Sequence, residues 1–240
     1  MMAATDEVLR DPAALAHRVA QWMTDLAQAK QDTFGVALSG GSTPRLLYQM
    51  LAKAPFLEAF PWQRVHWFWG DERFVPHSDP ESNFRMTSEA MLAHAPVPLD
   101  QIHPIPTVGV TPEESAQAYA RELKAFYDAD FLTSTRVLFD VVLLGLGEDG
   151  HTASLFPGSP VLDERNGWAA VADKGGQTRI TLTYPVLESC AHAAFLVSGA
   201  SKSAILARVR EGDAALPASR FRPQGDLHFF TDSEAAGCAA

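Results

Sequence analysis

Three short apolar runs in this sequence are each followed directly by a polar loop. The runs are FGVALS at 34–39, VHWFW at 65–69 and VLFDVVLLGL at 137–146. Runs of this length, rich in branched and aromatic residues, are typical of buried strands. Amphipathic helical segments separate them, so strands are expected to alternate with helices. This alternation predicts an α/β fold with a doubly wound, mainly parallel sheet and helices on both faces.

Helix starts support the same pattern. Asp11 and Pro12 are the residue types preferred at an N-cap and at the first helical position. Thr111 and Glu114 have the spacing of a capping box, which predicts a helix through about Phe131. Further strands are expected at 179–183, 193–198 and 226–231, a helix from about 201, and an extended connection at 96–106. In such folds ligands bind beyond the carboxyl ends of the strands, so the polar loops there are the expected site.

Length and composition restrict the class of protein. A chain of 240 residues with 47 % hydrophobic residues fits one α/β domain over residues 1–240. The formal net charge of −10 repels nucleic-acid phosphates, so no nucleic-acid partner is expected. We find neither a signal peptide nor an apolar run of about 18 residues, which predicts no membrane contact. Cys190 and Cys238 lack metal-like spacing, so a cytoplasmic protein with reduced thiols is expected. The sequence leaves open whether the protein is a monomer or a homodimer.

The first polar loop, SGGSTP at 39–44, joins a strand to the N-terminus of a helix. Free backbone N–H groups and the positive end of the helix dipole favour an anion there. Gly40 and Gly41 allow close approach of the backbone, and the hydroxyls of Ser42 and Thr43 add donors. A tight turn with hydroxyl capping is the alternative reading of this loop taken alone. The loop lacks the Walker lysine and the GxGxxG spacing, which disfavours a nucleotide.

Several charged residues are expected on the same side of the sheet. Asp71 and Arg73 directly follow the run VHWFW, and Arg73 can either bind a phosphate in bidentate fashion or neutralise its acidic neighbours. Lys202 falls in the first turn of a helix, where a cation opposes the dipole and an anion would hold it. Arg179 is a weaker cationic candidate, because an arginine at a strand entry is often solvated. Asn83 is interpreted as structural.

The loop GLGEDGHTASLFPGSP at 145–160 contains the strongest catalytic candidates, Asp149 and His151. A carboxylate can orient an imidazole, and an imidazole can accept a proton near neutral pH. A lone histidine is usually a surface or core residue, but this one follows the most strand-like run in a Gly-rich loop. The sequence has no HExxH or other paired-His spacing, so no metal site is expected.

Taken in order, these segments resemble the 6-phosphogluconolactonase family over nearly the whole chain. The matching segments are SGGSTP at 39–44, GDERFVP at 70–76, SNF at 82–84, GLGEDGHTASLFPG at 145–158, RITLT at 179–183 and the GxxK of 199–202. The block GEDGHTASLFPG is highly specific. SGGSTP and GxxK also occur in the related glucosamine-6-phosphate deaminases and isomerases, which share a Rossmann-like fold.

The resemblance implies a role for each candidate residue. A sugar phosphate would lie on the loop of Gly40, Gly41, Ser42 and Thr43, with Lys202 and either Arg73 or Arg179 supplying charge. His151 would deprotonate a water that attacks the lactone carbonyl and then help to protonate the ring oxygen, with Asp149 orienting it. Arg73 would alternatively face the developing oxyanion, and Asp71 would position Arg73 or substrate hydroxyls. The family requires no cofactor and no metal.

Two other functions stay open. The deaminase branch carries a glutamate five positions after the loop histidine, whereas this chain has Phe156 there. A non-catalytic sugar-phosphate sensor is the second alternative, since related folds serve as effector-binding domains of regulators. Such a protein is expected to carry a basic DNA-binding appendage, which this acidic chain lacks.

Overall fold

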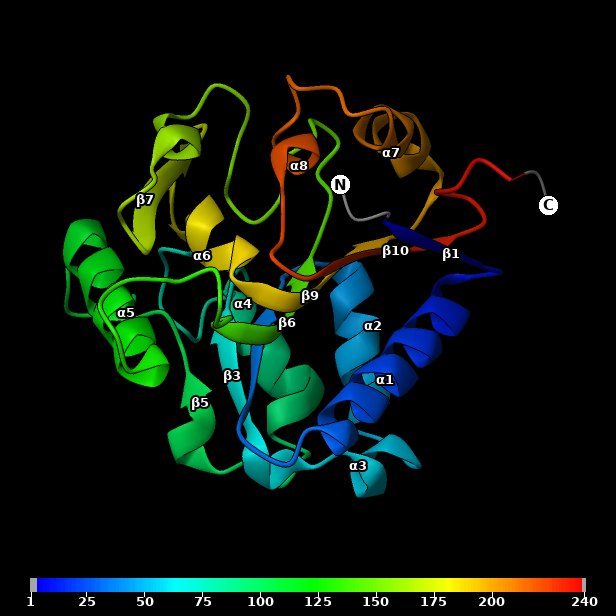
Figure 1. Ribbon diagram of the computed structural model, residues 1–240, viewed down its shortest axis with the longest axis horizontal. Helices are drawn as coiled ribbons and strands as arrows, with labels where there is room; N and C mark the ends of the chain where they lie inside the picture. Colours follow the sequence, from blue (N-terminus) through cyan, green and yellow to red (C-terminus); the bar gives the residue numbers. More distant parts are fainter. Residues whose placement is uncertain (1–3, 239–240) are drawn as a thin grey trace.

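A parallel sheet of seven strands runs through the part of the chain that the computed structural model describes, residues 4–238 (Figure 1). Its order is β1-β10-β9-β6-β2-β3-β5, and each pair of neighbours is parallel. The strands are β1 (Thr5–Leu9), β2 (Phe34–Leu38), β3 (Val65–Trp69), β5 (Ile102–His103), β6 (Phe139–Leu144), β9 (Cys190–Val197) and β10 (Asp226–Asp232). The predicted α/β class with a mainly parallel sheet is confirmed.

Helices cover both faces of this sheet. Figure 1 shows α1 and α2 on one side of β9 and β10, and α7 and α8 on the other. The α-helices are α1 (Pro12–Ala29), α2 (Ser42–Leu51), α3 (Phe56–Ala59), α4 (Asn83–Thr87), α5 (Pro112–Tyr127), α6 (Tyr184–Glu188), α7 (Ser203–Arg210) and α8 (Pro217–Arg220). Shorter 3₁₀ turns occupy Trp62–Arg64, Leu99–Gln101, Pro160–Asp163 and Ala200–Lys202, and a π turn occupies Ser88–Leu92. No helix within residues 4–238 is long and apolar enough to cross a membrane.

The central strands are buried along their length, which explains why they read as continuous apolar runs. β2 is buried at every position, and Trp67, Phe68 and Trp69 of β3 are at most 1 % exposed. A parallel sheet covered on both faces requires this, because neither face meets water. Because the strands are parallel, the loops that follow β2, β3, β6 and β9 emerge at the same end of the sheet.

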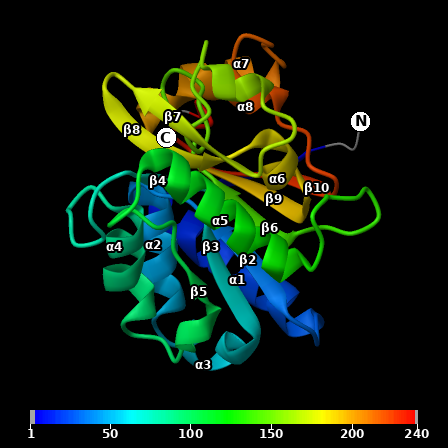
Figure 2. The same cartoon turned by 90° about the vertical axis from the view of Figure 1, so that its left-hand side faces the viewer.

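A second, antiparallel sheet stands beside α5 and contains β4 (Asp71–Arg73), β8 (Gln177–Leu182) and β7 (Ala169–Lys174) (Figure 2). Gly70 connects the two sheets, because its N–H donates to Leu38 O and its carbonyl accepts from Leu182 N. The expected strand at 179–183 therefore lies in a small antiparallel sheet. The sequence gives the strand but not the direction of its pairing.

Other boundaries differ from expectation for local reasons. The helix that begins after Thr111 ends at Tyr127, because Asp128 adopts a left-handed conformation with φ 53°, so the predicted end near Phe131 is wrong. The capping box at its start is present. The expected helix from about 201 begins as the 3₁₀ turn Ala200–Lys202 and continues as α7. β1 was not predicted, because this edge strand is polar and mostly exposed.

Candidate active site

A cavity of about 230 Å³ lies where the loops after β2, β3, β6 and β9 meet. It is lined by Ser39, Gly40, Gly41, Asp71, Arg73, Asn83, Gly145, Leu146, Gly147, His151, Ala153, Arg179 and Lys202. Among these lining residues, three cationic side chains face one carboxylate. A chain whose formal charge is −10 thus has a locally basic cavity, which suits an anionic ligand.

The glycine loop forms one wall of the cavity and leads into α2. Gly41 is the N-cap of this helix, so the amides of Ser42 and Thr43 belong to its first turn, where N–H groups lack intrahelical acceptors. Ser39 is fixed behind the loop, because its N–H donates to Tyr48 Oη at 3.0 Å and its carbonyl accepts from that hydroxyl at 2.7 Å. Ser42 and Thr43 are not among the lining residues, so their position favours a backbone contribution over the expected hydroxyl donors.

Gly40 must be a glycine because Asn83 lies against it. A Cβ at this position would lie 2.0 Å from Asn83 Oδ1. Asn83 is 3 % exposed, and its Nδ2 donates to the carbonyl of Asp71 at 2.9 Å. The structural role expected for Asn83 is present, but the side chain also lines the cavity and joins the glycine loop to β4.

Arg73 and Arg179 lie side by side, since they are register partners in the antiparallel pair β4 and β8. Each guanidinium makes one side-chain hydrogen bond, Arg73 to the Glu81 carbonyl and Arg179 to Gln177 Oε1. Within residues 4–238 the Nε atoms of both arginines are buried without an acceptor. Burial, followed by the charge of Arg73, lowers the pKa of Arg179. Two adjacent cations with unused donors are stabilised by an anion between them.

Arg73 does not neutralise Glu72. This carboxylate is 1 % exposed and accepts from the backbone amides of Arg73, Asn83 and Phe84 and from Ser82 Oγ. Burial raises the pKa of Glu72 against the opposing effect of these hydrogen bonds. Glu72 therefore fixes the start of α4 and leaves the Arg73 charge for the cavity.

The loop after β9 positions Lys202. Gly199 N donates to both carboxylate oxygens of Asp232, at 3.1 and 3.0 Å, and Ser198 Oγ donates to the same carboxylate. Asp232 is 1 % exposed at the end of β10. Lys202 N donates to Gly199 O at 3.0 Å, which closes the 3₁₀ turn and places Lys202 on the cavity.

His151 and Asp149 form the expected pair in the loop after β6. His151 Nδ1 is hydrogen-bonded to Asp149 Oδ1, and His151 N donates to the same oxygen at 3.2 Å. A carboxylate only accepts, so Nδ1 carries the proton and Nε2 is the basic nitrogen. Gly147 lies behind the ring, since a Cβ there would be 2.0 Å from His151 Nδ1.

The environment of this pair sets its charge. Burial lowers the pKa of His151, which outweighs the raising effect of Asp149, and the Lys174 charge acts in the same direction as burial. Lys174 Nζ lies 3.7 Å from Asp149 Oδ2. Burial alone would raise the pKa of Asp149, but the hydrogen bonds from His151 and the charges of His151 and Lys174 lower it. At neutral pH the pair is a carboxylate beside a neutral imidazole, the form that accepts a proton.

Asp71 also lines the cavity and is 6 % exposed. Its Oδ2 accepts from Ser154 Oγ at 2.6 Å, and its charge acts on both His151 and Arg179. The structure thus gathers Asp71, Arg73, Arg179 and Lys202 around one cavity.

Sequence reasoning did not single out four residues that shape this site: Asn83 as a lining residue, Ser154, Lys174 and Asp232. Ser154 stands in the segment 145–160, so its place in the loop that contains His151 was the one available signal. The other contacts depend on how the strands pair.

A larger hollow of about 600 Å³ lies between Phe156 and Asp173. Its described lining includes the acidic residues Glu164 and Asp173 and no lysine, arginine or histidine. It therefore does not suit an anion.

Comparison with known proteins agrees with this geometry. The family described as glucosamine-6-phosphate isomerases/6-phosphogluconolactonase matches residues 10–229. A 6-phosphogluconolactonase of Synechocystis sp. is 42 % identical over 213 residues, covering 88 % of this chain and 85 % of that protein. A crystal structure of 6-phosphogluconolactonase from Thermotoga maritima superposes with a TM-score of 0.82 at 28 % identity, covering 96 % of this chain and 100 % of that one.

Fold likeness alone does not separate the branches of this family. A structure of a monomeric glucosamine-6-phosphate deaminase has a TM-score of 0.83 at 19 % identity, covering 98 % of this chain and 100 % of that one. The sequence match over residues 10–229 is what decides membership. The chain belongs to the glucosamine-6-phosphate isomerase/6-phosphogluconolactonase family.

Proposed function

We propose that this protein hydrolyses 6-phospho-D-glucono-1,5-lactone to 6-phospho-D-gluconate, a step of the oxidative pentose phosphate pathway. The observation that carries the proposal is the shared cavity of an oriented, neutral histidine and a cluster of cations. A phosphorylated lactone needs both, because one end must be held as an anion while a water attacks the other.

The phosphate binds at the basic end of the cavity. The N-terminal turn of α2 offers the amides after Gly41, and Lys202 and the paired arginines contribute charge. The unused Nε donors of Arg73 and Arg179 support this assignment. One of the two arginines also faces the carbonyl oxygen, where a cation stabilises the oxyanion that develops during attack.

His151 acts as the general base. Its Nε2 removes a proton from a water as the water oxygen bonds to C1 of the lactone, and Asp149 stabilises the resulting imidazolium. The tetrahedral intermediate then collapses with cleavage of the bond between C1 and the ring oxygen. The imidazolium returns its proton to that oxygen, which becomes a hydroxyl. The new carboxylic acid loses its proton to solvent.

Phe156 favours a lactonase over a deaminase. Its ring lies 4.8 Å from the His151 ring, at the position where the deaminase branch has a glutamate. An apolar ring cannot transfer the protons that opening of an amino sugar requires. It also packs against His151 at a tilt of 56° and contributes to the burial that lowers the pKa of this histidine.

We further infer that a single domain over residues 1–240 performs this reaction in the cytoplasm, as a monomer or homodimer, without a cofactor. The residues of the cavity do not form a typical metal-ligand set, since a single histidine and one carboxylate line it within the described chain.

The proposal is tested with lactone generated freshly by glucose-6-phosphate dehydrogenase. Product is followed through NADPH formation by added 6-phosphogluconate dehydrogenase, and a protein-free blank measures spontaneous hydrolysis. We expect acceleration above the blank and no ammonia release from glucosamine 6-phosphate. Ammonia at a comparable rate would assign the chain to the deaminase branch.

A further inference from the structure

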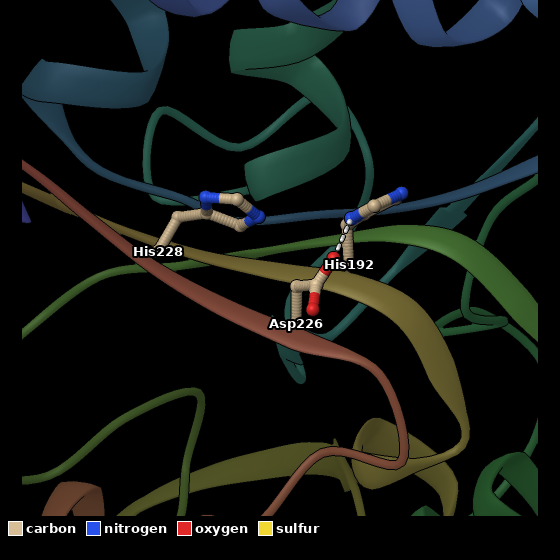
Figure 3. Close-up of side chains that lie close together, drawn as sticks. All are labelled: His192, Asp226 and His228. Carbon is tan, nitrogen blue, oxygen red and sulfur yellow. Dashed lines mark ion pairs between the residues drawn. The ribbon is translucent and has the colours of Figure 1, made fainter. Parts of the chain in front are cut away.

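Three side chains with metal-binding atoms face one another at the amino ends of β9 and β10. They are His192, Asp226 and His228 (Figure 3). Asp226 and His192 are register partners in the parallel pair, and His228 follows Asp226 by two residues on the same face. The active-site cavity lies at the carboxyl ends of the strands, so this cluster lies at the opposite end of the strands.

The ligand atoms of the three side chains are spaced closely enough to bind one cation. One ligand atom from each residue lies within 4.8 Å of the others. His192 Nδ1 is 3.4 Å from Asp226 Oδ2, close enough for an ion pair but without hydrogen-bond geometry. Figure 3 shows that His228 directs a ring nitrogen toward His192 and Asp226.

Two of the ring nitrogens in this cluster make no hydrogen bond. Within residues 4–238, His192 Nδ1 and His228 Nε2 are buried and make no hydrogen bond. Buried polar atoms are usually hydrogen-bonded, so these two nitrogens beside one carboxylate are available to bind a ligand. A metal ion can accept lone pairs from two imidazole nitrogens and a carboxylate oxygen together, and these are the three atoms that face one another here.

The surroundings also suit an ion. The Trp22 ring packs at 5.0 Å from His228 and 6.0 Å from His192 and forms an apolar wall. Asp226 has 57 % of its side chain exposed, which leaves an entry path and room for a water ligand. The charge of Arg18 reaches His228, but Arg18 already pairs with Glu7 through two hydrogen bonds of 2.7 and 2.8 Å.

We propose that His192, Asp226 and His228 bind a divalent transition-metal ion, preferentially Zn²⁺, with water as the fourth ligand. Zn²⁺ takes imidazole nitrogen at about 2.0–2.1 Å and carboxylate oxygen at about 2.0–2.2 Å, so tetrahedral ligands are about 3.3 Å apart. The separation of 3.4 Å between His192 and Asp226 already matches this value. The widest separation, up to 4.8 Å, must close by at most about 1.5 Å, which side-chain rotation of His228 supplies.

Such an ion would cross-link two neighbouring strands beneath α1, far from the lactone. It is therefore a site separate from the proposed hydrolysis. The sequence does not suggest it, because the histidines are far apart in the chain and parallel pairing brings them together.

The test uses the full chain without a polyhistidine tag, freed of metal with a chelator. Titration with Zn²⁺ in a calorimeter is expected to give one tight site, and Co²⁺ in its place is expected to give the visible absorption of a four-coordinate ion. Zn²⁺ is also expected to raise the unfolding midpoint. Wild-type protein that gives neither a Co²⁺ spectrum nor calorimetric binding overturns the proposal.

Variants locate the site. His192→Gln, His228→Gln and Asp226→Asn are each expected to weaken Zn²⁺ binding by at least the roughly 10- to 100-fold that loss of a supporting partner costs. The matched control is His94→Gln, an exposed histidine elsewhere, and His151→Ala checks the active site. Both are expected to retain full Zn²⁺ affinity. Binding that is lost in His151→Ala and kept in Asp226→Asn assigns the metal to the active site and overturns the proposal.

Discussion

Ser154 Oγ donates a buried hydrogen bond of 2.6 Å to Asp71 Oδ2, and these two residues are 83 positions apart. The bond ties the loop that carries His151 to the strand that carries Arg73. It therefore couples the proposed base to the proposed anion site. A change at Ser154 is expected to affect both binding and catalysis without touching substrate.

Ser154→Ala removes this donor and leaves a buried carboxylate with an unpaired oxygen. Loss of a hydrogen-bond partner from a buried group costs about 1–3 kcal/mol, so the free energy of unfolding is expected to fall by that amount. Urea titration measures it. Ser78→Ala, at an exposed serine, is the control and is expected to leave stability unchanged. Equal stability of the two variants would contradict a stabilising role for this hydrogen bond.

Lys202→Ala is expected to raise KM with little change in kcat, because a phosphate held away from C1 contributes equally in the ground and transition states. A charge-assisted hydrogen bond is worth about 1.5–3 kcal/mol, or about 10- to 150-fold in KM. Steady-state kinetics with Lys53→Ala, an exposed lysine on another surface, as control checks this. An unchanged KM would move the phosphate away from Lys202.

The pH profile reports the environment of His151. Its pKa is lowered below 6.5, and a general base must be neutral, so kcat/KM is expected to hold above that pKa and to fall as pH drops through it. Lys174→Ala removes a charge that lowers this pKa, so the acidic limb is expected to move to higher pH. Asp149→Asn removes a charge that raises it, so the limb is expected to move to lower pH, with a reduced plateau. Shifts in the same direction would contradict this assignment.

Metal removal distinguishes the proposed metal site from the proposed active site. Dialysis against a chelator is expected to leave lactone hydrolysis intact, because the cluster of His192, Asp226 and His228 lies at the opposite end of the strands from His151. The same dialysis is expected to lower the unfolding midpoint if the protein was purified with Zn²⁺ bound. Loss of turnover that one particular divalent ion restores would count against the proposed mechanism.

Most of the fold was predictable because strands buried on both faces appear in the sequence as apolar runs. β2, β3 and β6 are covered on both faces and read as apolar runs, and the capping box at Thr111 marks its helix correctly. β1 is mostly exposed and has no apolar run that would identify it as a strand. The direction of β8 depends on its contact with β4, which neither segment encodes alone.

The same distinction holds for the site. Gly40, His151 and Lys202 lie in loops that follow strand-like runs, so the rule that ligands bind at the carboxyl ends of strands predicted that they would lie near one another, and all three line the cavity. Asn83 was expected to be structural, but its place on the cavity wall and the role of Asp232 were missed. Asn83 holds the carbonyl of Asp71, and Asp232 holds the amide of Gly199. Such supporting contacts follow from tertiary packing, for which the chain carries no local signal.

His151→Ala gives the most direct test of the mechanism. The base acts in the transition state while the cations hold the phosphate, so kcat is expected to fall by about 10²–10⁴ and binding of 6-phosphogluconate to stay nearly unchanged. Single-turnover assays must be compared with a protein-free blank, because the lactone hydrolyses spontaneously. An unchanged unfolding midpoint shows that the variant is folded. We expect this result, because the His151 ring lines the cavity and is not part of the hydrophobic core. If His151→Ala keeps the wild-type kcat, the base lies elsewhere, and Asp71 is the next candidate because its carboxylate also lines the cavity.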